Sequence, residues 1–331
     1  MKTWQSCLIA CILLTVSSPA PGSIPPVTPP SSDTVQLRFA WPAGLNGSAT
    51  YQSTERVSSG GSEKQQTVTG TSTFTVKAAG DELIILQQSP SVTVQSTDPE
   101  QTATLQKLYE ALGKVPVAFV IGRDGSYRRL DGLKEIHATL LTELEKGFSE
   151  TLRGMPAADR QRVLDTLAGA VSAEQLEALF AAQWNREVAQ WIDADLEQGE
   201  WYELEFSSSV PMFNNAEIPM TALFRYAGKT QCNAADKKLS CVTLEMQSSA
   251  DPETIRQEVG NFVSKLAGTP LPVTFDNMQS TTSLRIVTEP ATLLPYEVSF
   301  TETSSVTVFA EGQSLETVKT RESTYRYTYD R

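Results

Sequence analysis

Apolar residues change their spacing twice along this chain, and this change constrains the fold more than any other feature. Between residues 133 and 196 they recur every three or four positions, beginning with the stripe Leu133, Ile136, Leu140, Leu144, Phe148 and Leu152. On either side they alternate with polar residues, as in Val35–Trp41 and Trp201–Phe206. A period of 3.6 is typical of an amphipathic helix, and alternation is typical of a half-buried strand. The pattern therefore predicts a helical insertion between two β-rich parts.

The insertion spans residues 133–198 and is predicted to contain three helices. Gly154 and Pro156 end the first helix. The second helix brings four apolar residues together: Val163, Leu164, Leu167 and Val171. The third begins at Ser172, where Gln175 completes a capping box. Because each helix has one apolar face to bury, we expect all three to pack on a sheet.

The predicted fold class is α+β, an antiparallel curved sheet or half-barrel with the three-helix insertion packed on it. Its β-rich parts, residues 34–132 and 199–331, form either one composite domain or two β-rich halves. Each part contains a further helix that begins at Asp-Pro-Glu, at residues 98–100 and 251–253. The same order of strands, proline-started helix and strands in both parts is compatible with a duplication. The favoured explanation is that Asp-Pro-Glu is a common start for unrelated helices.

The N-terminal 22 residues have the layout of a secretory signal peptide: a lysine, an apolar run at 7–16 and a small-residue cleavage site that ends at Gly22. A proline-rich linker follows at 23–33. The apolar run is shorter than the roughly 20 residues of a membrane-spanning helix. It also continues past Cys11, which argues against lipidation there. We therefore expect an exported protein, periplasmic or extracellular, without an integral membrane span.

Two cysteines follow the signal peptide, Cys232 and Cys241, with eight residues between them. Such a pair in an exported protein is expected to form a disulfide, here closing a hairpin loop. A metal site would need further ligands nearby, and the surrounding sequence has none. The net charge of −12 opposes long-range attraction to nucleic acid or to anionic lipid.

No set of residues in the sequence requires a particular reaction. His137 is the only histidine in the sequence, so a zinc site that needs several histidines is excluded. A catalytic triad that depends on histidine would have to use His137. Its place in an amphipathic helix favours a structural role. Glu200, Glu203 and Glu205 lie beside two aromatic residues. The wet face of a strand explains these acids better than a glycosidase pair does. We therefore predict no catalytic residue, no cofactor and no metal ligand.

Tyr325, Tyr327 and Tyr329 place three rings on one face of the last predicted strand. This pattern favours a strand that covers a core, and the alternative is a strand that lines a ligand groove. The distinction depends on what lies opposite the rings.

Three short segments, FVIGRDGS at 119–126, GEW at 199–201 and ATLLPYEV at 291–298, occur within this order of elements. Together they resemble bacterial envelope proteins built on a curved antiparallel sheet closed by helices, such as periplasmic lipoprotein carriers. They are also similar to exported bacterial families of uncharacterised function. The resemblance implies a half-barrel and assigns no binding residue.

Three functional hypotheses follow. The first is a non-enzymatic envelope protein that holds an apolar ligand, such as a lipid acyl chain, in the half-barrel under the helices. The second is a structural or interaction adaptor whose sheet is filled by its own helices and which contacts another envelope protein. The third is a hydrolase that uses carboxylates. The volume between sheet and helices separates the first two hypotheses.

Overall fold

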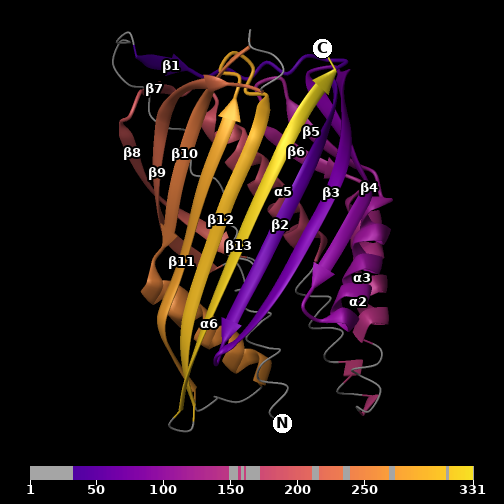
Figure 1. Cartoon of the computed structure of the whole chain (residues 1–331), viewed down its shortest axis with the longest axis vertical. Helices are drawn as coiled ribbons and strands as arrows, with labels where there is room; N and C mark the ends of the chain where they lie inside the picture. The colour runs from indigo at the N-terminus through magenta and orange to yellow at the C-terminus, as the bar shows by residue number, and fades with distance from the viewer. Residues whose placement is uncertain are drawn as a thin grey trace.

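The computed structural model describes residues 33–148, 156–157, 160–161, 172–210, 216–233, 239–267, 273–310 and 313–330. The predicted signal peptide, Cys11, nearly all of the proline-rich linker and the second helix of the insertion lie outside these residues. The described residues form a large curved antiparallel sheet with helices on its inner side (Figure 1).

Eleven strands form this sheet in the order β6-β5-β4-β3-β2-β13-β12-β11-β10-β9-β8. Their bounds are β2 Asn46–Ser59, β3 Ser62–Ala79, β4 Glu82–Ser96, β5 Val117–Gly122, β6 Tyr127–Asp131, β8 Trp201–Val210, β9 Ala216–Gln231, β10 Ser240–Ala250, β11 Val273–Thr288, β12 Pro295–Ala310 and β13 Gln313–Asp330. The two β-rich parts thus share one sheet. They meet where β2 pairs with β13, from Asn46 opposite Asp330 to Ser59 opposite Thr317. The sheet is open, with β6 and β8 as its edges.

The α+β class is confirmed. The described residues hold four α-helices: α2 Pro99–Gly113, α3 Leu133–Phe148, α5 Ala173–Glu187 and α6 Pro252–Ala267. The described part of the insertion holds two of them, α3 and α5, where three were predicted for the whole insertion, and the two proline-started helices form as predicted. Helices α2 and α6 also pack against the sheet, on β4 and on β11. Helix α6 packs there through its own apolar face, formed by Ile255, Val259 and Val263, which are all buried.

The last predicted helix is shorter than its sequence pattern suggested. The Ser172 capping box forms as predicted, but α5 ends at Glu187 with Val188 as its C-cap, and a 3-10 turn, η1 Ala189–Trp191, follows. The chain then enters a short strand, β7 Asp195–Glu197, because the backbone of β1 Thr34–Gln36 pairs with it.

The strand predicted at Val35–Trp41 is mostly wrong. Only its first residues are extended in β1, and residues 37–45 form a crossing segment over one end of the sheet. Backbone hydrogen bonds of this crossing segment go to different neighbours in turn: Leu37 donates to Ala194, Arg38 to Pro290 and Gly44 to Val76. The alternation of apolar and polar residues along this segment shows that one of its sides is buried. A segment can bury one side without hydrogen bonding to a neighbouring strand.

The two proline-started helices occupy equivalent places in the sheet. Helix α2 connects β4 to its antiparallel neighbour β5, and α6 connects β10 to its antiparallel neighbour β11. The predicted hairpin of β5 and β6 also forms, with Gly125 at a φ of 83° in its turn. Gly125 suits this position because a side chain there is strained.

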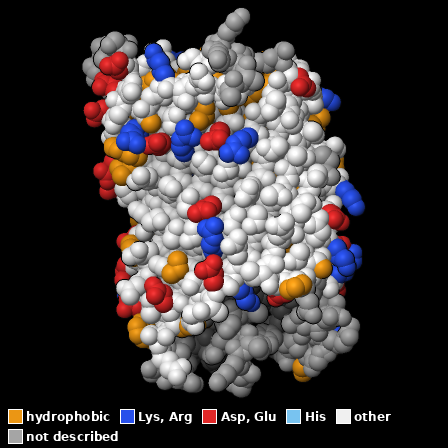
Figure 2. Space-filling model, in the orientation of Figure 1, with side chains coloured by type: hydrophobic (Ala, Val, Ile, Leu, Met, Phe, Trp, Pro, Cys, Tyr) orange, Lys and Arg blue, Asp and Glu red, His pale blue; other side chains and the backbone are white. Residues whose placement is uncertain are grey.

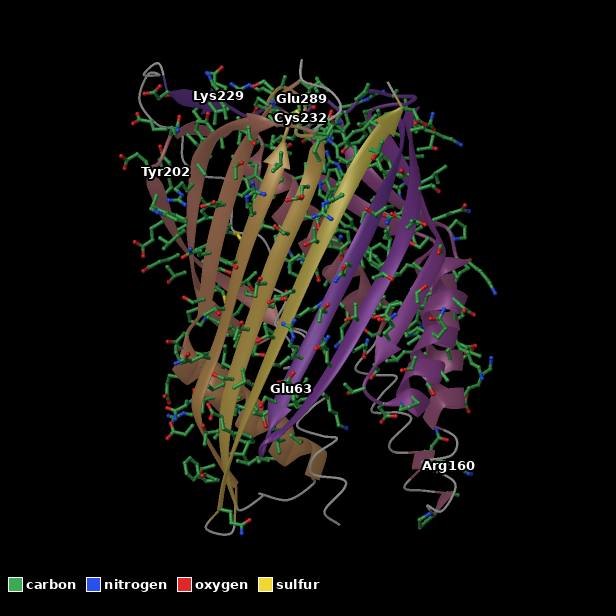
Figure 3. The ribbon with its side chains drawn as sticks, viewed as in Figure 1. Glu63, Arg160, Tyr202, Lys229, Cys232 and Glu289 are labelled. Atoms are coloured by element: carbon green, nitrogen blue, oxygen red, sulfur yellow. A yellow bond between two sulfur atoms is a disulfide. The ribbon has the colours of Figure 1, made fainter. Side chains whose placement is uncertain are left out.

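The main core lies on the concave side, between the sheet and α5. Trp41 packs edge-on against Trp184 at 5.3 Å between ring centroids, and Trp191 packs against Phe224 at 5.5 Å. A second apolar cluster lies at the other end, where α6 covers Met220, Met278 and Val306. The end of the sheet near the crossing segment carries the Cys232–Cys241 disulfide, which links the ends of β9 and β10 (Figure 3). Among the described residues no helix has the length and apolar character needed to cross a membrane.

Candidate functional site

Charged side chains interrupt the apolar concave face between the two core clusters. We call this group the inner charge cluster; its members are Glu55, Arg186, Glu187, Glu302, Lys319 and Arg321. Strand alternation explains why β13 contributes two of them. Lys319 and Arg321 lie an even number of residues before Tyr325, which packs on the core, so all three point to the same side of the sheet.

Cross-strand register brings the cluster together. Arg321 lies opposite Glu55 on β2 and opposite Glu302 on β12. Lys319 Nζ is 2.9 Å from Glu55 Oε2, and Lys319 is only 6% exposed. The ammonium group is therefore largely removed from solvent, whereas the Glu55 side chain is 30% exposed.

Glu302 lies between two guanidinium groups. Its carboxylate is 3.7 Å from Arg186 of α5 and 4.0 Å from Arg321. Both guanidinium groups also lie over the Phe300 ring, at 4.9 and 5.7 Å from its centroid. Arg321 donates a further hydrogen bond to Ser53 at 3.3 Å. The ion-pair distances are long, and a guanidinium has five N–H donors, so these contacts leave donors such as the buried Arg186 Nε unused.

Two buried polar atoms at the cluster have no partner among the described residues. They are Nε of Arg186 and Oε1 of Gln190, and these residues are 8% and 3% exposed. Gln190 uses its amide nitrogen to donate to the Arg186 carbonyl at 2.6 Å. Buried polar atoms in native proteins are nearly always hydrogen-bonded, so such atoms point to a bound water or ligand.

Glu187 decides the charge balance of the cluster. Burial raises its pKa, against the opposing effects of Arg186 and of hydrogen bonds from Gln183 and Tyr327. The Tyr327 hydroxyl donates to Glu187 at 3.4 Å, and the Gln183 amide donates at 3.1 Å. Burial favours the neutral form of this acid. With Glu187 ionised the cluster holds three cations and three carboxylates, and with Glu187 neutral it holds three cations and two carboxylates.

Aromatic rings line the cluster. Tyr325 stacks between Tyr51, at 5.8 Å, and Phe300, at 6.3 Å between centroids. Tyr109 of α2 lies close enough for the charges of Arg321 and Glu55 to act on its hydroxyl. Burial raises the pKa of Tyr325 to about 12 and also raises the pKa of Tyr51 and Tyr109. These phenols are neutral near pH 7, so each can donate a hydrogen bond.

The sequence left two roles open for Tyr325, Tyr327 and Tyr329, covering a core or lining a ligand groove, and the three residues differ in what they contact. Tyr325 and Tyr327 reach the inner charge cluster. The Tyr329 hydroxyl donates to the Pro295 carbonyl instead, and its ring packs against Phe74 at 5.8 Å. Tyr329 therefore belongs to the core at the disulfide end.

The other residues singled out in the sequence do not join the cluster. His137 lies on α3, and Glu203 and Glu205 are exposed on the outer side of β8, as expected for the wet face of a strand. Within the described ranges no group of three or more histidine, cysteine or acidic residues is placed to hold a metal ion.

The convex face carries a row of ion pairs across neighbouring strands, Arg225–Glu245, Arg285–Glu297 and Arg326–Glu297. Figure 2 shows cations and acids alternating across this face. A depression of about 310 Å³ on this face is lined by Thr50, Tyr51, Gln52, Thr54, Thr69, Glu322, Thr324 and Arg326. It lacks buried unpaired polar atoms, so the inner charge cluster is the better candidate site.

No protein family model matches this chain, and no curated protein matches it. Among solved structures, an outer membrane channel from Pseudomonas putida F1 aligns over 91% of this chain and 100% of its own, at 8% identity and a TM-score of 0.20. Pseudomonas aeruginosa OpdQ aligns over 87% of this chain and 100% of its own, at 6% identity and a TM-score of 0.20. Similarity at this level assigns neither fold nor function.

Proposed function

We propose that this is a non-enzymatic exported protein that binds an amphiphilic molecule with an anionic head group on the concave face of its sheet. The observation that carries the proposal is the inner charge cluster, in which Arg186 and Arg321 lie on either side of Glu302 and the buried Arg186 Nε has no partner among the described residues. The Cys232–Cys241 disulfide supports an oxidising compartment such as the periplasm or the cell exterior.

Arg186 and Arg321 are the groups that would bind the anionic head group. A carboxylate or phosphate accepts bidentate hydrogen bonds from a guanidinium, and two such groups here share only the long contacts to Glu302. The phenols of Tyr51 and Tyr325 add neutral donors beside them. These groups favour an anion over a cation.

Apolar surface on both sides of the cluster fits the tail of an amphiphile. On β12, Val306 follows Glu302 on the same face and belongs to the α6 cluster, and Val298 precedes it in the main core. Phe206, Phe262 and Phe275 pack on the α6 cluster and are only partly buried. A ligand chain that leaves the head group along the strands therefore meets apolar side chains.

The second candidate is an interaction adaptor that binds no small molecule. The observation that favours it is the packing under α5. Aromatic side chains of the protein itself, among them Trp184, Trp191 and Phe224, fill this half of the concave face. This filling limits any ligand to the cluster and the α6 end.

A matched pair of arginine variants tests the proposal. Arg321 and Arg326 lie on the same strand, but Arg321 faces the cluster and Arg326 lies on the convex face, with a side chain that is 70% exposed. Binding of a dansyl-labelled fatty acid is measured by fluorescence, with a dansyl-labelled alkylamine as the cationic comparison. We expect fatty-acid binding to weaken about tenfold in Arg321→Gln and to remain unchanged in Arg326→Gln. Equal binding of both probes, or equal effects of both variants, would overturn the proposal.

A further inference from the structure

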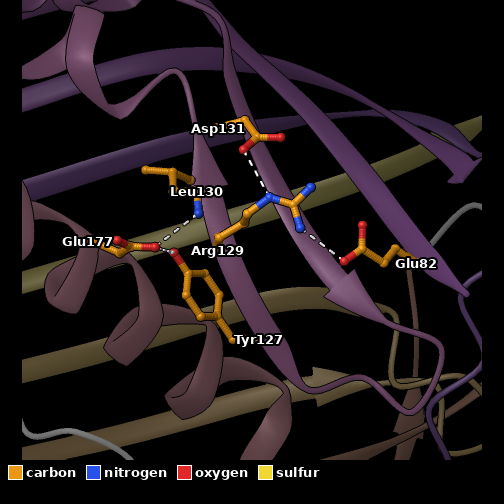
Figure 4. A network of polar contacts seen from close by, with 6 residues as sticks. All are labelled: Glu82, Tyr127, Arg129, Leu130, Asp131 and Glu177. Carbon is orange, nitrogen blue, oxygen red and sulfur yellow. Dashed lines mark hydrogen bonds and ion pairs between the residues drawn. The ribbon is translucent and has the colours of Figure 1, made fainter.

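The two edges of the sheet are protected to different extents. At the β6 edge the Leu130 backbone N–H donates to Glu177 of α5 at 3.3 Å, and the Tyr127 hydroxyl donates to the same carboxylate at 3.4 Å (Figure 4). Arg129 is held by Glu82 and Asp131, at 3.0 and 3.2 Å. The Glu177 carboxylate therefore already accepts from the Leu130 N–H, a backbone donor that a further strand would use.

The β8 edge has no such cover in the part of the chain that the structure describes. All ten residues, Trp201–Val210, pair with β9 on one side, and no described strand lies on the other (Figure 1). Its inward side chains Tyr202, Leu204 and Phe206 remain only half-buried, and Trp201 is 38% exposed. An edge strand of this length presents a row of backbone donors and acceptors for pairing.

Acidic residues give this edge a definite charge preference. Glu200, Glu203 and Glu205 are all exposed, and the last two alternate on the outer face of β8. The neighbouring cation, Arg225 of β9, is already paired with Glu245 and lies 4.4 Å from the Trp201 ring. A second copy of β8 would therefore place acids against acids, which is unfavourable for cross-strand neighbours.

We propose that β8 is a docking edge for an extended segment of another protein, in which apolar residues alternate with lysine or arginine. The segment adds to the sheet as a further strand. Its backbone hydrogen bonds supply affinity, and its side chains supply specificity. The apolar side chains extend the concave surface beside Leu204 and Phe206, and the basic side chains meet Glu203 and Glu205. This inference is independent of whether the inner charge cluster binds a ligand.

The test uses a fluorescein-labelled peptide of alternating lysine and valine, matched to β8 in length. Fluorescence anisotropy measures its binding to the full-length protein. Three comparisons are made: an alternating glutamate–valine peptide, a lysine–valine peptide methylated on its backbone nitrogens, and the charge-reversal variant Glu203→Lys/Glu205→Lys. The matched control is Glu63→Lys/Glu316→Lys, which makes the same charge change at exposed positions of β3 and β13. Hydrogen exchange of the protein with and without peptide locates the contact.

We expect the lysine–valine peptide to bind, to slow exchange in β8 and to leave β6 unchanged. Charge reversal on β8 should weaken binding about tenfold, since two attractive cross-strand pairs become repulsive, and the control variant should bind normally. Backbone methylation should abolish binding. Equal binding of the methylated peptide, unchanged exchange in β8, or a peptide-free dimer with β8 protected would each overturn the proposal.

Discussion

Glu187 is the residue whose ionisation should affect the native state most, because it is buried beside Arg186 and its pKa is raised by burial. A carboxyl with a higher pKa in the folded protein loses stability as pH rises from its ordinary pKa through the raised one. We expect Glu187→Gln to increase the free energy of unfolding above this window by about 1 kcal/mol. Below the ordinary glutamate pKa both side chains are neutral, so the variants should match. Urea unfolding at about pH 4 and about pH 8 measures the difference, and an equal gain at both pH values would contradict the ionisation argument.

For individual residues, the sequence predicted those whose partners are close in the chain and missed those whose partners are far away in the chain. Cys232 and Cys241 were found because a short loop joins them. The inner charge cluster draws Glu55, Arg186 and Glu302 from three elements whose proximity depends on strand order. One clue was present in β13, where Lys319 shares the alternation of the core-facing tyrosines. An inward charge in an otherwise apolar series indicates a buried polar site.

Among the elements, α5 carries the two cluster residues Arg186 and Glu187 at its C-terminal end, so its own stability should matter for the site. The Ser172 side chain accepts a hydrogen bond from the Gln175 backbone N–H at 3.3 Å, and Gln175 bonds back to the Ser172 N–H. We expect Ser172→Ala to lower the free energy of unfolding by about 1 kcal/mol. Chemical denaturation measures this change.

Ser172→Asp is the control for the cap, since aspartate also accepts at this position and favours a helix N-terminus. It should retain the stability that alanine loses. Equal losses in the two variants would show that the hydroxyl acts through packing and not through the cap.

Helix starts and hairpin turns were predictable because they depend on residues close in sequence, as at Ser172 and Gly125. The crossing segment at 37–45 was not, because its hydrogen-bond partners come from three distant parts of the chain. The end of α5 was missed for a related reason. Leu196 lies four residues after Ile192, at helical spacing, but pairing of residues 195–197 with β1 outweighs helix propensity there.

For the whole molecule, the strand order was the property that the sequence left open. Alternation shows which side of a strand faces the core but does not identify its neighbour. The observed order places the seam between the two β-rich parts at β2 and β13, which pair over fourteen positions. Each part therefore completes the concave face of the other, and the inner charge cluster itself spans this seam.

This arrangement predicts that the two parts unfold together. Thr324 lies in β13, opposite Gln52 of β2 and Ser299 of β12, so a proline there disrupts a central strand. We expect Thr324→Pro to lower the free energy of unfolding by about 3 kcal/mol, whereas Thr324→Val, which keeps strand propensity, should change it little. Tryptophan fluorescence and far-ultraviolet circular dichroism should give coincident urea transitions in the wild type and shift together in the proline variant. Separate transitions would mean that one part folds without the other, and the seam would then not be needed for the concave face.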